Sequence, residues 1–406
     1  MTTAQTTPPD ADAAAGVVGG TEDPGGIGMA DGLVALVRSA TQSRAAAVKA
    51  GVGLSSEAVR IALGRSSVEP ARGDGRFADP TWSENPGYRR LKQGYLAWSA
   101  AVDSVVEAAD VDWRTRERAR FAAGILTSSL APTNTLPGNP AALKRVIETG
   151  GGSLVSGARH FVDDLLHNRG MPKQVDASGF KVGENMAVTP GAVVYRDEVC
   201  EVLQYQPTTP TVRSRPVIMI PPPINKYYFM DLAPRRSFIE HAVAKGIPFF
   251  VISWRNPRKE HAEWGLDTYA EAVLGAIDVA CEVSGSDDVI ALGLCAGGII
   301  TATVLSYLAA RGDGRVHAVS FGVTLLDWDV PAMVGAFQSP GLLSIARRKS
   351  RRAGVLDARS LGTVFTWMRP NELVWNYWVK NYLMGKEPPA FDILAWNDDK
   401  TNLPGA

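Results

Sequence analysis

Gly293-Leu294-Cys295-Ala296-Gly297-Gly298 is the stretch whose residue types and spacing point most directly to chemistry. An apolar run, 289–292, precedes it, and a segment of helical character, 299–305, follows it. A strand, a Gly-x-nucleophile-x-Gly turn and a helix form a nucleophile elbow, which exposes one side chain above the sheet edge. A thiolate at a helix N-terminus is activated by the helix dipole and can carry an acyl group. We therefore predict that Cys295 is a catalytic nucleophile; the alternative is a buried structural cysteine.

Composition and charge exclude several classes of protein. The chain has 406 residues, and Lys plus Arg equals Asp plus Glu at 42 each, so nothing suggests a nucleic-acid partner. Cys200, Cys281 and Cys295 are far apart and form no CxxC pair, which argues against a disulfide framework or a zinc site. Residues 1–26 do not have the pattern of a signal peptide, and no apolar run is long enough for a transmembrane segment. We expect a cytoplasmic enzyme.

The N-terminal half divides into a mobile arm and a helical domain. Residues 1–75 are predicted to form the arm, with 1 to about 30 disordered and 33–63 helical but interrupted at Gly51 and Gly53. This arm is either loosely packed or a surface-binding element for a hydrophobic phase. Residues 76–185 are predicted to be all-helical, with helices over 88–109, 113–130, 141–148 and 153–167.

At Ala192 the apolar period changes from 3.6 to 2, which marks the start of a sheet. Residues 186–326 alternate short apolar strands with helices, a pattern typical of a parallel sheet covered on both faces. The strands are expected at 192–195, 199–205, 217–220, 249–252, 289–292 and 316–326, and the helices at 236–245, 268–283 and 299–305. The fold class is therefore α/β: an α/β-hydrolase core preceded by a helical N-terminal domain.

The last segment, 327–406, is rich in tryptophan and is expected to be the start of a cap or lid. Its tryptophans are Trp328, Trp367, Trp375, Trp378 and Trp396. Aromatic side chains over a hydrolase active site keep water out; ordinary helical packing is the alternative.

Several longer motifs carry a family resemblance. They are Val182-Gly183-Glu184-Asn185, Pro221-Pro222-Pro223-Ile224-Asn225-Lys226-Tyr227-Tyr228, Ser253-Trp254-Arg255-Asn256-Pro257, the elbow itself, Arg369-Pro370-Asn371, and Trp396-Asn397 with Thr401-Asn402-Leu403-Pro404-Gly405. Together they resemble polyhydroxyalkanoate (poly-3-hydroxybutyrate) synthases, and most closely the class I enzymes. The resemblance runs from about Arg76 to the last residue.

This resemblance implies an acyltransferase that polymerises (R)-3-hydroxyacyl-CoA, typically 3-hydroxybutyryl-CoA, into a polyester and releases CoA. Cys295 matches the family nucleophile and would hold the acyl chain as a thioester. The backbone N–H of Ala296 would form half of the oxyanion hole. We assign the other half to Ile224 on the loop after the first core strand, because prolines 221–223 have no N–H to donate.

The same resemblance sets the expected partners. CoA is part of the substrate and a product, and no separate cofactor or metal is expected. The protein is expected to be a homodimer that associates with the surface of polyester granules in the cytoplasm.

The sequence departs from a complete hydrolase triad. Its histidines are His160, His167, His241, His261 and His317, and only His317 follows Cys295. His317 starts a strand, whereas a triad histidine belongs on a loop after the last strand, so we interpret it as structural. In the family the triad Asp and His lie beyond the Asn-Leu-Pro-Gly motif, so we expect a C-terminally truncated sequence with little activity of its own. Asp327 and Asp329 end a core strand and are either the acid or N-caps.

Two other functions stay open. A cysteine-dependent α/β-hydrolase, such as a thioesterase, would share the elbow but release a free acid. An inactive fragment with a granule-surface or dimerisation role is the non-catalytic alternative. The helical domain and the tryptophan-rich segment favour the synthase over the thioesterase, because small hydrolases need neither.

Overall fold

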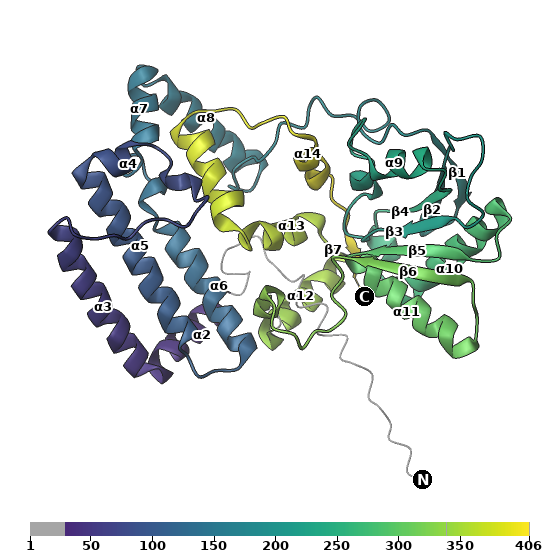
Figure 1. The fold of residues 1–406 in the computed structure, drawn as a ribbon, viewed down its shortest axis with the longest axis horizontal. Helices are drawn as coiled ribbons and strands as arrows, with labels where there is room; N and C mark the ends of the chain where they lie inside the picture. Colours follow the sequence, from purple (N-terminus) through teal and green to yellow (C-terminus); the bar gives the residue numbers. More distant parts are fainter. Residues whose placement is uncertain (1–28, 338, 406) are drawn as a thin grey trace, which may run out of the picture. The chain divides into compact units, whose positions relative to one another are not determined.

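The chain forms two units in the computed structural model, which describes residues 29–337 and 339–405 (Figure 1). The helical unit contains the described residues up to Gln174, together with Pro331–Ala346 and Ser360–Pro388. The sheet unit contains Val175–Val330, Arg347–Arg359 and the segment from Pro389 onward. This division differs from the expected one, because residues after 330 are shared between the two units and do not form a separate lid.

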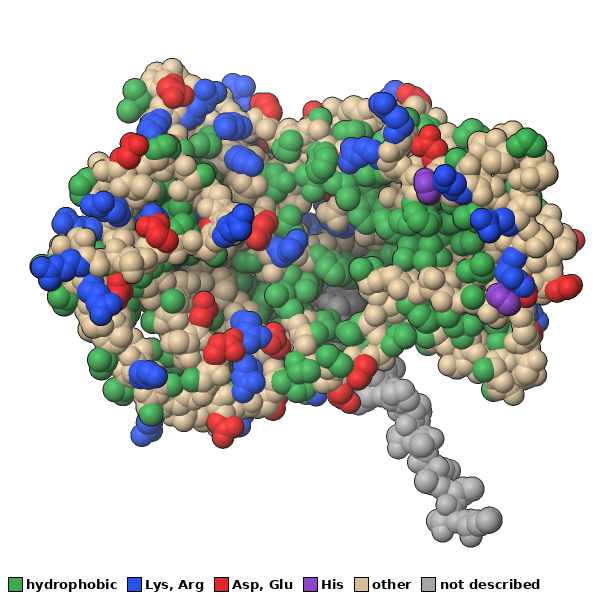
Figure 2. All heavy atoms as spheres, viewed as in Figure 1, with side chains coloured by type: hydrophobic (Ala, Val, Ile, Leu, Met, Phe, Trp, Pro, Cys, Tyr) green, Lys and Arg blue, Asp and Glu red, His purple; other side chains and the backbone are tan. Residues whose placement is uncertain are grey.

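Seven helices precede the sheet in the described part of the chain, and four of them match the helices expected over 88–167. They are α2 (Met29–Gln42), α3 (Arg44–Ala62), α4 (Thr81–Glu84), α5 (Pro86–Glu107), α6 (Trp113–Ser129), α7 (Pro140–Glu148) and α8 (Gly152–His167). Short 3₁₀ turns η2 (Gly75–Phe77) and η3 (Pro132–Asn134) connect them. The expected cap of α7 is present, since the side chain of Asn139 accepts a hydrogen bond from Ala142 N at 3.0 Å. On the face in view, charges of both signs are interspersed over this unit (Figure 2).

The first of these helices is packed more closely than a loose arm would be. A Cβ on Gly32 of α2 would lie 2.9 Å from Cβ of Ala122 on α6, and Ala35 and Ser39 are buried. The helix break falls at Ser43, and α3 continues through both Gly51 and Gly53, where a break was expected. The disorder expected for residues 1 to about 30 falls almost wholly outside the described residues.

A second layer of the helical unit comes from the C-terminal part of the chain. Its elements are η6 (Met333–Phe337), the first half of α12 (Pro340–Ala353), most of α13 (Ala358–Trp367) and two π-helical turns, η7 (Asn371–Trp375) and η8 (Trp378–Leu383). Phe337 and Trp367 join Phe121 in one apolar cluster, and the Phe121 and Phe337 rings meet edge to face at 5.0 Å. This burial explains why segments after residue 330 pack with the N-terminal helices.

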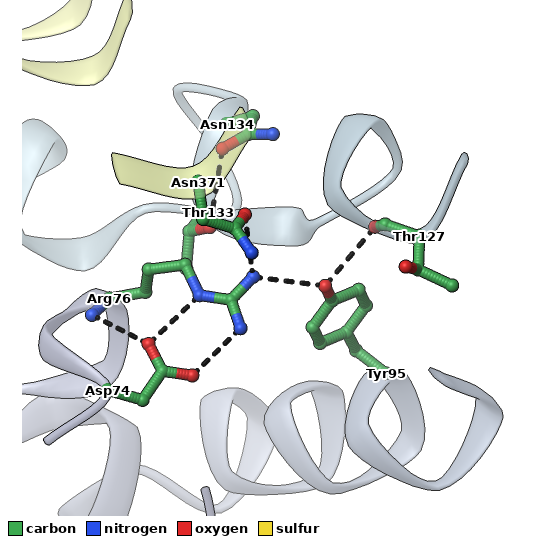
Figure 3. A network of polar contacts seen from close by, with 7 residues as sticks. All are labelled: Asp74, Arg76, Tyr95, Thr127, Thr133, Asn134 and Asn371. Atoms are coloured by element: carbon green, nitrogen blue, oxygen red, sulfur yellow. Dashed lines mark hydrogen bonds and ion pairs between the residues drawn. The ribbon is translucent and has the colours of Figure 1, made fainter. Parts of the chain in front are cut away.

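Arg76 ties these two parts of the helical unit together (Figure 3). Its guanidinium donates to Asp74 at 2.8 and 2.9 Å, to Tyr95 Oη at 3.1 Å and to Asn371 Oδ1 at 3.1 Å. Burial opposes ionisation of Asp74, but the hydrogen bonds and charge of Arg76 outweigh it and lower the pKa of that carboxyl. The network therefore joins residues about 300 positions apart in sequence through one charged side chain.

The sheet unit is built on six strands in the order β1-β2-β4-β3-β5-β6 (Figure 1). They are β1 (Gly191–Arg196), β2 (Cys200–Tyr205), β3 (Val217–Ile220), β4 (Phe249–Trp254), β5 (Val289–Leu294) and β6 (Val316–Gly322). β1, β2 and β4 pair antiparallel, whereas β4, β3, β5 and β6 pair parallel. The expected hairpin and the expected parallel strands are both present.

Helices cover both faces of this sheet. α9 (Phe238–Ala244) packs on the face that carries Met219 and Val251, and α10 (Leu266–Ser284) and α11 (Ala296–Arg311) pack on the face that carries Ile218 and Ile252. The unit also contains η4 (Tyr227–Met230), η5 (Lys259–His261), α14 (Asp392–Asp398) and a small antiparallel pair, β7 (Val355–Leu356) with β8 (Leu403–Pro404). Among the described residues, no helix combines the length and apolarity needed to cross a bilayer.

Candidate active site

Cys295 lies at the turn between the parallel strand β5, which pairs with β3 and β6, and helix α11. Its backbone has φ 52° and ψ −124°, a left-handed conformation that costs a non-glycine residue about 1–3 kcal/mol. Its N–H donates to Gly322 O of β6 at 2.9 Å, and its carbonyl accepts from Gly298 N at 2.9 Å. The thiol is partly exposed and makes no capping hydrogen bond to the helix. The strand, strained turn and helix expected around Cys295 are therefore present.

Three glycines allow this turn to be so tight. A Cβ on Gly293 would lie 2.7 Å from Oγ1 of Thr301, and one on Gly298 would lie 2.1 Å from Oγ1 of Thr324. A Cβ on Gly297 would lie 2.2 Å from the carbonyl oxygen of Ile220, a backbone atom. Since backbone cannot move aside cheaply, α11 reaches the end of β3 only because residue 297 is glycine.

The loop after β3, which carries Ile224, runs beside the start of α11. The same missing Cβ of Gly297 would lie 2.5 Å from Pro221 O, which places the proline segment against the first turn of the helix. Trp254, at the end of β4, donates from its indole Nε1 to Pro221 O at 2.8 Å in a buried setting. Ala296 begins α11, so its N–H has no partner within the helix. Ile224 is half-buried in a turn closed by Asn225 N and Pro222 O.

A C-terminal segment of the sheet unit holds the outer end of this loop. Thr401 N donates to Ile224 O at 3.1 Å, and Asn225 forms an antiparallel bridge with Lys400. Trp396 donates from Nε1 to Lys226 O at 2.8 Å, and Tyr228 donates to Asp399 at 2.7 Å. Sequence reasoning missed these supporting roles. Trp254, Trp396 and Thr401 do lie in the motifs quoted above, which was the only signal available. The sequence alone assigned no individual role to these three residues.

His317 lies at the opposite edge of the sheet from Cys295. In the parallel pairing, Val316 faces Val289 at the start of β5, whereas Gly322 faces Leu294 at its end. The five residue steps from 317 to 322 correspond to about 16 Å along the strand. His317 is about half exposed and lies 3.6 Å from Asp288, which also pairs with Arg215. These contacts agree with a structural histidine.

Three of the other histidines have partners away from the elbow. His160 contacts Asn381 O and Glu387, and His167 contacts Asp163. His261 is buried and stacks on Trp264 at 4.2 Å. Asp327 accepts from Asp329 N at 2.9 Å, so it closes a local turn beyond β6. Among the described residues, no cluster of three or more His, Cys, Asp or Glu side chains is arranged to hold a metal ion.

The other two cysteines are poor nucleophiles. Cys200 is buried at the start of β2, and burial together with the nearby Asp197 carboxylate raises the pKa of its thiol to about 12. Burial also raises the pKa of Cys281, which lies within α10. A raised thiol pKa leaves less thiolate at neutral pH and so less nucleophile.

The comparisons with known proteins first define the class of fold. Residues 225–406 match the family model described as the alpha/beta hydrolase fold. With the parallel sheet, the helices on both faces and the elbow, this confirms the predicted α/β-hydrolase core and the helical N-terminal region. A more specific family match covers an earlier part of the chain. Residues 73–242 match the model of the Poly-beta-hydroxybutyrate polymerase (PhaC) N-terminus.

Curated relatives give the same picture over most of the chain. The chain is 45% identical over 350 residues to Poly(3-hydroxyalkanoate) polymerase 1 of Ectopseudomonas oleovorans, covering 86% of this chain and 62% of that protein. It is 41% identical over 353 residues to the Poly(3-hydroxyalkanoate) polymerase subunit PhaC of Cupriavidus necator, covering 85% and 59%. For Poly(3-hydroxyalkanoate) polymerase of Methylorubrum extorquens the identity is 38%, with coverages of 84% and 57%. The chain thus spans about three fifths of the length of these relatives.

Proposed function

We propose that this chain belongs to a polyhydroxyalkanoate synthase, an acyltransferase that joins (R)-3-hydroxyacyl groups from CoA thioesters into a polyester. The observation that carries the proposal is Cys295, held with positive φ between β5 and α11 in a chain similar to poly(3-hydroxyalkanoate) polymerases. A covalent carrier suits a polymerase, because the growing chain must stay attached while the next monomer arrives. We further propose that the protein is a class I synthase and that it prefers 3-hydroxybutyryl-CoA.

The proposed loading step uses the elbow directly. The Cys295 sulfur attacks the thioester carbonyl carbon, and the negative oxygen of the tetrahedral intermediate accepts from the N–H groups of Ala296 and Ile224. The intermediate collapses with cleavage of the bond to the CoA sulfur, which takes up the proton lost by the Cys295 thiol. CoA leaves as its thiol, and the acyl group remains on Cys295. The close approach of Gly297 to Pro221 supports this assignment, since it brings the two donor segments side by side.

The proposed elongation step moves that acyl group to a hydroxyl. The 3-hydroxyl oxygen of an incoming acyl group attacks the Cys295 thioester, an ester bond forms, the carbon–sulfur bond breaks and the hydroxyl proton passes through a base to the departing sulfur. His317 does not fill that role, because it lies at the far edge of the sheet. The proposal includes no cofactor beyond CoA itself. It also includes a cytoplasmic homodimer on the polyester granule surface.

A product assay tests the proposal. The full-length synthase to which this chain is proposed to belong is purified and incubated with (R)-3-hydroxybutyryl-CoA, and both CoA release and the form of the product are measured. The proposal expects insoluble polyester that depends on Cys295. CoA release with soluble 3-hydroxybutyrate alone would instead establish the thioesterase. Absence of any CoA release would favour the non-catalytic alternative.

A further inference from the structure

A polar cavity of about 230 Å³ opens at the carboxyl edge of the sheet unit. Its walls come from the β1–β2 hairpin, the end of β4 and the loop after β3. The lining residues are Arg196, Asp197, Cys200, Glu201, Lys226, Ser253, Trp254, Arg255 and Asn256. The mechanism proposed above uses none of these side chains for chemistry. Ligands of open α/β sheets bind at this edge, outside the carboxyl ends of the parallel strands.

The acidic side chains in this cavity have partners, whereas two of its basic side chains have none in the part of the chain that the structure describes. Arg196 pairs with Glu201 at 2.7 Å, and Asp197 accepts from the backbone N–H groups of Val199 and Cys200 at 2.7 Å each. Both carboxylates are therefore already engaged. Lys226 and Arg255, by contrast, have no ion pair or side-chain hydrogen bond with any described residue. Together with the Ser253 hydroxyl and the Asn256 amide, they leave a set of donors for an anion.

The position of the cavity relates it to Cys295. Trp254 forms one wall and also donates to Pro221 O, the atom beside Gly297. β4 and β5 flank β3, so Trp254 and Cys295 are separated by two strand spacings, about 10 Å. A CoA thioester has its phosphates well away from its sulfur, at the far end of the pantetheine arm. A phosphate in this cavity would thus leave the thioester free to reach the elbow.

We propose that Lys226 and Arg255 bind a phosphate group of the CoA portion of the substrate. This inference rests on the proposed function, because that function supplies the CoA thioester. The guanidinium of Arg255 offers a planar fork for two phosphate oxygens, and the Lys226 ammonium adds a point charge from the other wall. The cavity would determine affinity for the CoA portion, while the acyl group is handled at Cys295.

Calorimetric binding of CoA and of pantetheine, which lacks the phosphates, tests the proposal without requiring turnover. We expect Lys226→Met and Arg255→Gln each to weaken CoA binding at least tenfold and to leave pantetheine binding unchanged. Arg255→Lys, which keeps the charge, should retain more affinity than Arg255→Gln. Lys245→Met is the matched control; Lys245 follows α9 at the other edge of the sheet, and its loss should not alter CoA affinity.

Two outcomes would overturn the proposal. One is CoA affinity within twofold of the unmodified protein in both variants, and the other is an equal loss of CoA and pantetheine affinity. Thermal melts of each variant show whether the fold is retained. Failure of the polymerase proposal gives a different result. A protein that binds CoA through Lys226 and Arg255 but forms no polyester would contradict the proposed reaction and still support the phosphate site.

Discussion

Gly297 and Pro221 are in such close contact that a single added methyl group would overlap the proline backbone. The Cβ position on Gly297 lies 2.5 Å from Pro221 O and 2.7 Å from Pro221 C. This contact joins the first turn of α11 to the loop after β3. Because Gly297 has no side chain, the two segments proposed to supply the oxyanion donors can lie in direct contact.

Gly297→Ala should therefore destabilise the protein and abolish its activity. The methyl group must push α11 away from β3, and overpacking of this kind costs about 1–3 kcal/mol. Urea denaturation measures the free energy of unfolding. Gly275→Ala in α10 is the control, since no atom lies within 4 Å of its Cβ position. Replacing a helical glycine there should stabilise the fold by about 0.5–1 kcal/mol. Equal stability of the two variants would contradict this account of the elbow.

Local pattern was sufficient to predict the elbow and most elements of the sheet. Strand and helix periods are properties of short segments, so β3, β4, β5 and α10 begin and end within about two residues of their expected positions. Helix α11 is present where expected but is longer than the predicted segment 299–305 at both ends. The roles of Trp254 and Trp396 were not predictable in this way. Each donates to a backbone carbonyl 33 or 170 positions away, and no local spacing encodes such a contact.

The division of the chain into two units could not be predicted from local sequence patterns either. The tryptophan-rich segment was expected to be one lid, yet Trp367 packs with Phe121 in the helical unit and Trp396 packs on Phe229 in the sheet unit. Amphipathic patterning shows that a helix has an apolar face but not which partner covers it.

The three cysteines should differ in reactivity. At pH 8 the Cys200 thiol stays protonated because its pKa is raised to about 12, and the raised pKa of Cys281 slows its reaction as well. We expect iodoacetamide to label Cys295 at least ten times faster than Cys200, as measured by peptide mass spectrometry over time. Faster labelling of Cys200 than of Cys295 would argue against the exposed elbow thiol.

In the full-length protein, His317→Gln should leave the activity within about twofold of the original. The imidazole lies at the amino edge of β6, beside Asp288, and its exposed contact contributes about 0–1 kcal/mol at most. Steady-state CoA release measured across pH 6 to 9 checks this. A large loss of activity, or a shift in the pH profile, would assign His317 a catalytic role that its position in the sheet does not support.

Asp74→Asn should destabilise the helical unit by about 2 kcal/mol at pH 7, because Arg76 loses its charged partner. The pKa of Asp74 is lowered in the folded protein, so its contribution is complete above its ordinary value of 3.8 and is lost as pH falls through the lower folded value. The stability difference between the two proteins should therefore shrink below pH 4. Glu148→Gln, in an exposed pair with Arg145, serves as the control and should change little. A difference that stays constant down to pH 2 would contradict this assignment.

Intact-mass spectrometry of the full-length protein after exposure to (R)-3-hydroxybutyryl-CoA tests the central claim most directly. The account predicts one or more 3-hydroxybutyryl groups on the unmodified protein, located by peptide mapping to Cys295. It also predicts the same adduct on Cys281→Ala and none on Cys295→Ala. A covalent acyl group that persists on Cys295→Ala, or that maps to another residue of the unmodified protein, would contradict the claim that Cys295 is the nucleophile.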